Sequence, residues 1–449
     1  MNRRSMRLGL VVPAVALGAL LAPATSAFAL APTSSPSVSP SPSPSPVGPW
    51  RQQTVPTEEH LHGIFAFDGC HVWAVGEEAG DNNTTPNAQS SVVASTDGGK
   101  TWKAQTFPTG SAKLATMNRV FFTDVNRGYA AGENNGAFTG ATPTPSPSPS
   151  ASPAATGPNF LTTVDGGATW VDITANLPVE TRNTSNREAD IEGLTAIGDK
   201  VWIAESNNGD GVIAYSANRG ATWSVQKIAA GDGFASISMF DANNGFAISD
   251  NGFIWRTVNG GGAWTQGAAT QQQPEGIWAS GPLAASIVEE SGVIEYTTDG
   301  VTLFPATLPS AVGTNDLLDV SFGSALNGVA SGELNGKLLE TADGGKNWTS
   351  QTANAGSNNF NGVTMAKGTT ISFVTGESGA VSANTDPAVG CVAAAAAQLP
   401  ANTSATPKLP AAGFGTNFEG PLWIGFVLMV LMGLGVGGRA VAQRIRSRV

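Results

Sequence analysis

Charged side chains are scarce in this sequence. Asp, Glu, Lys and Arg make up 13% of its 449 residues, well below the ~25% of an average domain. This scarcity argues against a coiled coil, a charged helical bundle and a basic nucleic-acid binder. Cysteine is rarer still, and two cysteines exclude a disulfide-dense scaffold and a Cys-rich zinc module.

Familiar catalytic motifs are also missing. The sequence contains no Gly-x-Ser-x-Gly, no His-Glu-x-x-His, no phosphate-binding loop and no dinucleotide fingerprint. We therefore predict no catalytic residue, no metal ligand and no cofactor. What is abundant is glycine, with 55 residues, beside 11 tryptophans. This combination points to strands and turns that are repeated many times.

The two ends predict export and anchoring. Residues 1–29 have the basic, apolar and small-residue regions of a signal peptide. Residues 421–441 predict a transmembrane helix, and the arginines of the tail 442–449 place it in the cytoplasm by the positive-inside rule. The segment between them is then extracellular. Because seven basic residues belong to the ends, its net charge is about −18, which disfavours nucleic acid and anionic lipid headgroups as partners.

Linkers separate these ends from the centre. A Ser/Pro-rich linker spans 30–48, a Pro/Ser-rich insertion spans 141–158, and a stalk spans 392–420. The stalk contains Leu409-Pro410-Ala411-Ala412-Gly413, and the order of this motif, apolar run and basic tail resembles a sortase cell-wall sorting signal. We expect either a single-pass membrane protein or a sortase-attached wall protein, and both readings place the protein on the cell surface.

Between the linkers, an eight-residue pattern of Ser/Thr-x-Asp-x-Gly-x-Thr-Trp recurs. In such a turn the Asp or Asn oxygen accepts backbone N–H groups, the Gly supplies a positive φ, and the Trp begins the return strand. Six copies at matching offsets predict hairpin turns. Their structural residues are Ser95, Asp97, Gly99, Trp102, Thr163, Asp165, Gly167, Trp170, Ser216, Asn218, Gly220, Trp223, Thr257, Asn259, Gly261, Trp264, Thr297, Asp299, Thr341, Asp343, Gly345 and Trp348.

The spacing of these turns predicts an all-β, seven-bladed β-propeller over residues 49–391. Turns without insertions recur every 40–44 residues, the length of a four-stranded blade. Residues 49–54 look like the strand after a turn but no turn precedes them, whereas the last unit, 361–386, lacks that strand. We therefore expect the N-terminal strand to complete the last blade and close the ring.

The same closure brings the two cysteines toward one seam. Cys70 lies in the first blade and Cys391 just after the last one. Outside the cell we expect a disulfide between them. The alternative, two unpaired thiols, stays open.

The repeated turns resemble the Asp-box, or bacterial neuraminidase, repeat. The full unit, with strands such as Gly128-Tyr129-Ala130-Ala131-Gly132 before each turn, looks most like the photosystem II assembly/stability factor family of seven-bladed propellers. This resemblance covers residues 49–390. It implies a photosynthesis-related role as an assembly or stability factor that binds a membrane protein complex.

The long insertions predict which face binds. Glu78–Ser91 and Glu133–Asn159 join the second and third strands of a blade, Thr174–Asp190 joins two blades, and these connections share one face. An acid recurs near the end of each second strand, and these candidate binding-face acids are Glu77, Glu133, Glu205, Asp250, Glu289, Glu333 and Glu377. They predict attraction for cations, calcium included, or for a basic partner. A plain turn role is the alternative.

Two function classes remain open. The favoured one is a non-catalytic, cell-surface scaffold with a monomeric ectodomain, which binds a protein or another cell-envelope ligand on its insertion-bearing face. The alternative is a carbohydrate-binding or glycoside-hydrolysing surface protein, because Asp-box turns occur in sialidases. A sialidase needs a tyrosine nucleophile. Of the three tyrosines, Tyr215 and Tyr296 precede repeated turns, Tyr129 lies in a core strand, and all three look like packing residues.

Overall fold

The computed structural model describes residues 49–78, 90–105, 116–133, 159–181, 189–207 and 210–384. The chain divides into two units, Met1–Ala397 and Gln398–Val449, and every described residue lies in the first. The predicted signal peptide, linkers, Pro/Ser-rich insertion, stalk, transmembrane helix and tail lie outside the described residues and stay predictions. Within the described ranges, no helix is long and apolar enough to cross a membrane.

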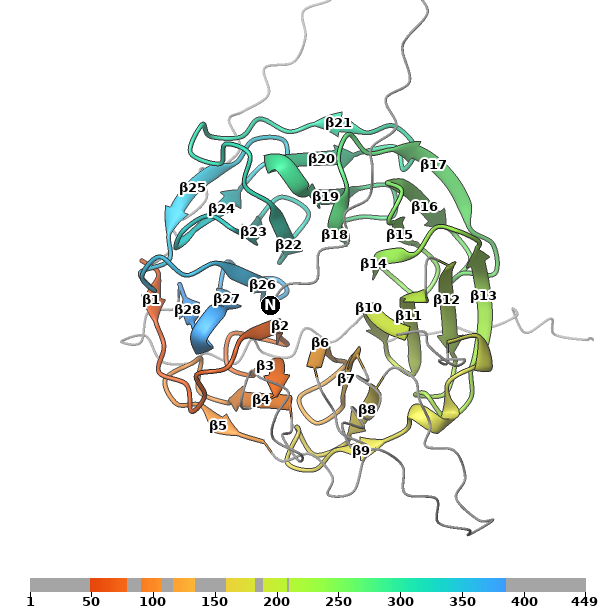
Figure 1. Ribbon diagram of the computed structural model, residues 1–449, viewed down its shortest axis with the longest axis horizontal. Helices are drawn as coiled ribbons and strands as arrows, with labels where there is room; N and C mark the ends of the chain where they lie inside the picture. Colours follow the sequence, from red (N-terminus) through yellow and green to blue (C-terminus); the bar gives the residue numbers. More distant parts are fainter. Residues whose placement is uncertain are drawn as a thin grey trace, which may run out of the picture. The chain divides into compact units, whose positions relative to one another are not determined.

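The described residues form the predicted seven-bladed propeller, with antiparallel four-stranded blades around a common centre (Figure 1). We label the strands of each blade A to D from the centre outward. Blades 1 and 2 are also joined by a single bridge between Glu77 and Thr116.

The blades take their strands in chain order, apart from the last. Blade 1 contains β2 (Leu61–Ala66), β3 (Val72–Glu78), β4 (Ser90–Ser95) and β5 (Lys103–Ala104); blade 2 contains β6 (Thr116–Phe122), β7 (Gly128–Glu133), β8 (Asn159–Thr163) and β9 (Val171–Asp172). Blade 3 contains β10 (Ala189–Ile197), β11 (Lys200–Asn207), β12 (Asp210–Ser216) and β13 (Ser224–Ala229); blade 4 contains β14 (Phe234–Met239), β15 (Gly245–Ser249), β16 (Phe253–Thr257) and β17 (Thr265–Ala269).

The remaining blades follow the same plan. Blade 5 contains β18 (Pro274–Ala279), β19 (Ala285–Glu289), β20 (Val293–Thr297) and β21 (Phe304–Pro305); blade 6 contains β22 (Leu317–Phe322), β23 (Gly328–Gly332), β24 (Lys337–Thr341) and β25 (Thr349–Thr352). Blade 7 contains β26 (Phe360–Met365), β27 (Ser372–Gly376), β28 (Val381–Ala383) and, as its outer strand, β1 (Arg51–Gln52). Short 3-10 turns are η1 (Thr174–Asn176), η2 (Val179–Thr181), η3 (Glu290–Gly292) and η4 (Glu377–Gly379).

Ring closure by the N-terminal strand is confirmed. Arg51 pairs with Ala383 and Gln52 with Ser382 in antiparallel register. Trp50, just before β1, is 3% exposed and donates its indole N–H to Glu340 Oε1 in blade 6 at 3.0 Å. Trp50 and β1, at the start of the ring, therefore join blade 7 to blade 6.

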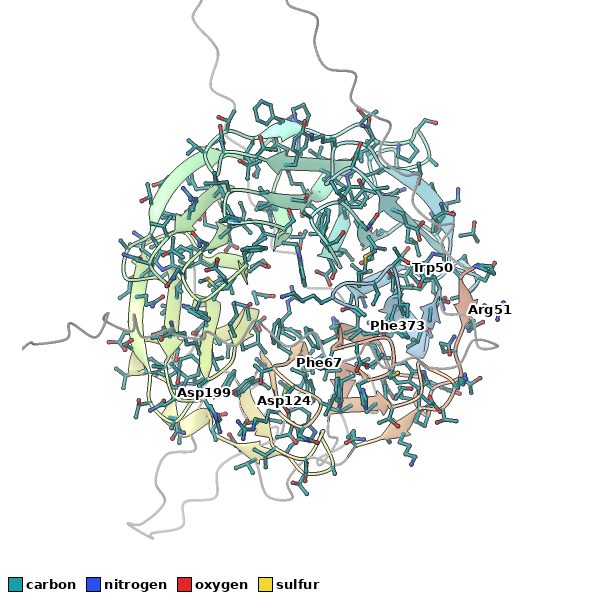
Figure 2. The ribbon with its side chains drawn as sticks, turned by 180° about the vertical axis from the view of Figure 1, so that it is seen from behind. Trp50, Arg51, Phe67, Asp124, Asp199 and Phe373 are labelled. Atoms are coloured by element: carbon teal, nitrogen blue, oxygen red, sulfur yellow. The ribbon has the colours of Figure 1, made fainter. Side chains whose placement is uncertain are left out.

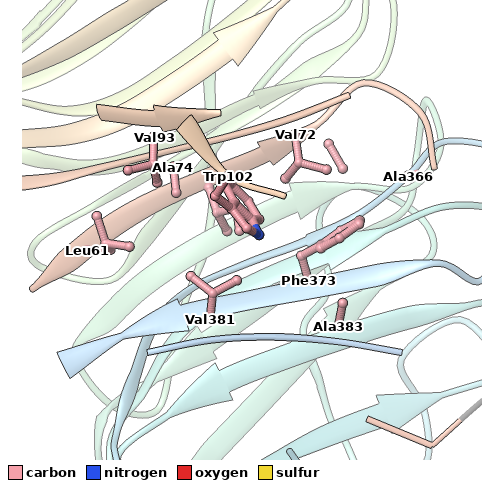
Figure 3. Close-up of a cluster of buried hydrophobic side chains, with 11 residues drawn as sticks. Leu61, Val72, Ala74, Val93, Trp102, Ala366, Phe373, Val381 and Ala383 are labelled. Carbon is pink, nitrogen blue, oxygen red and sulfur yellow. The ribbon is translucent and has the colours of Figure 1, made fainter. Parts of the chain in front are cut away.

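The core consists of apolar clusters between neighbouring blades. Figure 3 shows the cluster at the closing seam, where Trp102 and Val72 of blade 1 face Phe373 and Val381 of blade 7. The B strands β15, β19, β23 and β27 are buried along their whole length because a neighbouring blade covers each face. Such strands need apolar and small residues at every position rather than an alternating pattern.

Strand order gives the ring two faces. The D–A and B–C connections share one face, which we call the insertion face. The A–B and C–D connections share the other, which we call the turn face. All three long insertions lie in D–A or B–C connections, as predicted. Figure 2 views the ring from behind and labels Phe67, Asp124 and Asp199 in A–B connections of blades 1 to 3.

Candidate functional site

The repeated eight-residue pattern forms the C–D connection of blades 1 to 6. In blade 2, Asp165 Oδ1 accepts the N–H of Thr169 at 2.8 Å, and its Oδ2 accepts the Thr169 hydroxyl at 2.6 Å. The Thr163 hydroxyl donates to Asp165 and accepts the N–H of Gly167, whose φ is +92°. The Thr169 hydroxyl, together with the other donors of the turn, lowers the pKa of Asp165. This network satisfies the turn's own polar groups, so it serves the fold.

Four further turns repeat this network. In each, the Ser or Thr hydroxyl donates to the Asp or Asn oxygen and accepts the N–H of the Gly. The residues are Ser95, Asp97 and Gly99 in blade 1; Ser216, Asn218 and Gly220 in blade 3; Thr257, Asn259 and Gly261 in blade 4; and Thr341, Asp343 and Gly345 in blade 6. Trp102, Trp170 and Trp348 are buried, whereas Trp223 and Trp264 are half-buried.

The degenerate copy in blade 5 is tighter by one residue. The Thr297 hydroxyl accepts the N–H of Gly300, three residues on, instead of the N–H four residues on. Asp299 accepts the N–H groups of Val301 and Thr302 at 2.8 and 2.7 Å. Phe304, which takes the tryptophan's place, is 40% exposed. The second glycine is missing because this tighter turn does not use it.

The candidate binding-face acids occupy two adjacent positions rather than one. Glu205 and Glu289 lie inside B strands and pair directly with Ile191 and Pro274 of the A strands. Glycine fills that paired position in the other blades except blade 4, which has Ser249. The remaining predicted acids stand one residue later. Glu77 and Glu133 still belong to the B strands β3 and β7, whereas Asp250, Glu333 and Glu377 begin the B–C connection. Blade 5 has Glu290 at that later position and blade 3 has Ser206.

Glu205 is a buried carboxyl group without a hydrogen bond. Its side chain is 0% exposed, and neither Oε1 nor Oε2 has a partner. Burial raises the pKa of Glu205 well above its usual value. Burial thus favours the neutral, protonated form of Glu205, because an isolated buried carboxylate is costly. The group is also enclosed by the protein rather than displayed on the insertion face.

Glu289 forms a carboxyl pair with Glu295 of the C strand. Glu289 Oε2 accepts the N–H of Gln272 at 2.7 Å, and Glu295 accepts both the N–H and the side-chain amide of Gln271. Burial raises the pKa of Glu289 to about 8, and the neighbouring Glu295 carboxyl acts in the same direction. The two side chains are 0% and 3% exposed. At neutral pH the pair holds a proton, and it ties the blade 4–5 connection to blade 5.

The channel contains acids that the sequence interpretation missed. All seven A–B strand pairs have a β-bulge that leaves one A-strand residue unpaired, and these residues are His62, Asn118, Glu192, Ala235, Glu275, Leu318 and Asn361. The A strands are the innermost strands of the ring (Figure 1). A bulge redirects the unpaired side chain. The bulge position has no residue type that recurs from blade to blade, so the sequence gives no signal for it. Glu192 and Glu275 were overlooked for that reason.

Glu275 lies at the centre of this acidic region. Burial, together with repulsion from Glu290, Glu192 and Asp316, raises the pKa of Glu275 to about 7. The positive charge of Arg119 in blade 2 acts in the opposite direction and partly offsets this rise in the pKa of Glu275. It likewise partly offsets the rise that burial causes in the pKa of Asp319 in blade 6. Because blades 2 and 6 are not neighbours, these side chains interact across the channel. Within the described part of the chain, neither Glu192 nor Glu275 has a hydrogen-bond or ion-pair partner.

Acidic residues dominate the described part of the insertion face. Its described D–A and B–C connections hold no lysine or arginine. They do hold many acids, namely Glu58, Glu59, Glu180, Asp232, Asp250, Glu290, Asp316, Glu333 and Glu377. Several of these also have turn roles: Asp232 accepts the N–H of Asn251, and Asp316 accepts the N–H of Ser291. Such a one-signed surface attracts a cationic partner.

The tyrosines occupy packing positions. Tyr129 is 2% exposed and stacks on Phe160, with ring centres 5.9 Å apart. Tyr215 packs against Trp202 and Tyr296 against Phe304.

The remaining features are clusters of metal-ligating residue types and the two cysteines. No group of three or more His, Cys, Asp or Glu that could hold a metal ion occurs among the described residues. Cys70 is buried and disulfide-bonded. Cys391, its expected partner, lies outside the described residues, so this pairing stays a prediction.

Comparison with solved structures places the fold among several propellers. The chain is similar to YCF48 bound to a D1 peptide, with 19% identity over 75% of this chain and 97% of that chain and a TM-score of 0.53. YCF48 from Cyanidioschyzon merolae matches with 20% identity, 75% and 98% coverage and a TM-score of 0.52. A catalytically inactive virginiamycin B lyase from Staphylococcus aureus matches with 12% identity, 74% and 98% coverage and a TM-score of 0.53. At these identities the likeness concerns the fold alone.

No family model and no curated protein matches the sequence.

Proposed function

We propose that this protein is a cell-surface, non-catalytic scaffold that binds a basic protein segment on its insertion face. The observation that carries the proposal is the charge of that face, where the described connections contain acids but no lysine or arginine. A rigid propeller that presents loops of one charge sign steers an oppositely charged partner toward itself.

The channel mouth is the proposed anchor point. Glu192 and Glu275 come from blades 3 and 5, and mutual repulsion contributes to the raised pKa of Glu275. A lysine or arginine placed between them would relieve that repulsion and form charge-assisted hydrogen bonds. The gain is specific to a cation, because an acidic or neutral segment leaves the repulsion in place.

The likeness to YCF48 supports a peptide ligand. One of the two similar YCF48 structures is bound to a D1 peptide, and this chain shares its fold. We propose an analogous role here, in which the chain acts as an assembly or stability factor for a membrane protein that exposes a basic segment. The predicted signal peptide and tail support a site of action outside the cell.

Peptide binding tests the proposal directly. Fluorescence anisotropy is measured with the full chain and with peptides of equal length that are Lys/Arg-rich, Glu-rich or uncharged. We expect the basic peptide to bind, with an affinity that falls as salt rises. The Glu192→Gln/Glu275→Gln variant should weaken binding by roughly threefold to tenfold.

Asp124→Asn, on the turn face, is the matched control. An asparagine oxygen still accepts the N–H of Asn126, so the turn is kept while one charge is lost. We expect its affinity to equal that of the parent chain. Equal binding of basic and acidic peptides, or equal loss in both variants, would refute the proposed site.

A further inference from the structure

Large apolar side chains are exposed on the turn face of three successive blades. The A–B connections of blades 4, 5 and 6 present Phe240, Leu283 and Leu326, which are 42%, 43% and 50% exposed. The C–D connections of blades 4 and 5 add Val258 and Val301, at 58% and 57%. We call these five residues the apolar arc. Single exposed apolar residues need no explanation, but a group on one face marks a contact surface.

Hydrogen bonds join the two turn-face connections in blades 4 and 6. In blade 4 the Asn243 carbonyl accepts the N–H of Gly260 at 2.8 Å, and in blade 6 the Leu326 carbonyl accepts the N–H of Gly344 at 2.9 Å. In blade 5 the Val301 carbonyl instead accepts the N–H of Ala268 in blade 4 at 3.3 Å. These connections are therefore tied to one another or to the neighbouring blade.

The turn face differs in charge from the insertion face. Its described connections carry bases of their own, namely Lys100, Arg127, Arg219, Lys346 and Lys367. Its aspartates accept hydrogen bonds from their own turns or from Arg219; they are Asp68, Asp97, Asp124, Asp165, Asp199, Asp241, Asp299 and Asp343. With five bases against eight aspartates, the described turn face is only weakly acidic, so an anionic surface would repel it less than the described insertion face, which has acids and no base.

Both ends of the described ring lie on the turn face. β1 begins where a C–D connection would end, and the last described residue, Asn384, stands where that connection would begin. The chain that continues from Asn384 carries the uncharged apolar run 422–438. A ring tethered to a bilayer from this face meets the membrane at a high effective concentration, so a weak surface contact suffices.

We propose that the turn face docks on the surface of a lipid bilayer, with the apolar arc of blades 4 to 6 in the headgroup region. Leucine and phenylalanine side chains enter that region when the rest of the surface stays hydrated. The acid-rich insertion face then points away from anionic headgroups and toward soluble or neighbouring proteins. This orientation goes beyond the proposed peptide binding and does not depend on it.

Hydrogen exchange tests the docking. The full chain is reconstituted in vesicles of phosphatidylglycerol and phosphatidylcholine and compared with the same chain in detergent micelles. We expect slower exchange in vesicles at residues 240–244, 280–284 and 323–327, and unchanged exchange at residues 250–252 and 333–336. Equal slowing on both faces, no slowing, or failure of the chain to float with the vesicles would overturn the proposal.

A matched pair of triple variants distinguishes docking through the arc from non-specific hydrophobic adsorption to the vesicles. Phe240→Ser/Leu283→Ser/Leu326→Ser removes three residues of the arc, and we expect it to return exchange to the micelle level. The control, Val171→Ser/Val179→Ser/Ile228→Ser, removes three side chains of 56%, 68% and 52% exposure outside the turn face; it should keep the slowing. Equal behaviour of the two variants would contradict the proposal. Basic-peptide affinity should stay unchanged in the arc variant, which keeps the two proposals independent.

Discussion

Glu205 is a polar group that the fold buries without compensation. Replacing it with leucine removes two unsatisfied oxygens while keeping a side chain of similar size. Because an unpaired buried polar group costs about 1–3 kcal/mol, we expect Glu205→Leu to raise the free energy of unfolding by that amount. Urea denaturation at pH 7 measures it, with the exposed Glu58→Leu as control. A loss of stability would show that Glu205 has a partner in the folded protein.

The Glu289–Glu295 pair makes stability depend on pH. The folded-state pKa of Glu289, about 8, lies above the value of 4.5 for an unperturbed glutamate. Folded protein therefore holds more protons than unfolded protein between these values, and the free energy of unfolding falls as pH rises through this window.

Denaturation midpoints between pH 5 and pH 9 measure this dependence. We expect a fall of at most about 1.4 kcal/mol per pH unit from this group. Glu289→Gln cannot ionise, so its stability should vary less with pH than that of the parent chain. An unchanged slope in the variant would assign the pH dependence to other groups.

At the scale of elements, the repeated turns differ naturally at the Asp position, and this difference predicts the effect of substitutions there. Blades 3 and 4 use Asn218 and Asn259 where blade 2 has Asp165, and their oxygens accept the same N–H groups. We expect Asp165→Asn to be nearly neutral. Asp165→Ala leaves the Thr169 N–H without its partner, so it should lower the free energy of unfolding by about 1 kcal/mol. Urea denaturation of both variants measures the difference, and equal effects would mean that the network is not what holds the turn.

The sequence supported the elements better than the site. Some features follow from short sequence patterns or from the spacing of the repeats. These are the turn residues, the blade length and the strand at 49–54 that lacks its own blade, and each lies in the structure where the repeat predicts it. Register is different, because a shift of one residue moves a side chain between core and connection. In the sequence, Glu205 and Glu289 cannot be told apart from the acids at the ends of the other B strands, yet their side chains are buried. Glu192 and Glu275 became visible only through the bulges that place them at the channel.

For the molecule as a whole, Trp50 is the residue whose loss should open the ring. It packs among buried residues of blades 6 and 7 and holds Glu340 by a hydrogen bond. We expect Trp50→Ala to lower the free energy of unfolding by about 3–5 kcal/mol, as for other buried tryptophans. Trp50→Phe keeps most of the packing and should cost much less. Thermal unfolding of both variants would contradict the closure role if the two losses were equal.

This closure also sets the order of events during synthesis. Trp50 and Glu340 are 290 residues apart in the chain. At about 5–20 residues per second, the first strand waits roughly 15–60 s for its partners to be made. During that time β1 is an unpaired strand beside a growing ring with an open edge, and such edges invite pairing with other chains. Among the described strands, the one that is made first is thus the last to find its partner in the ring.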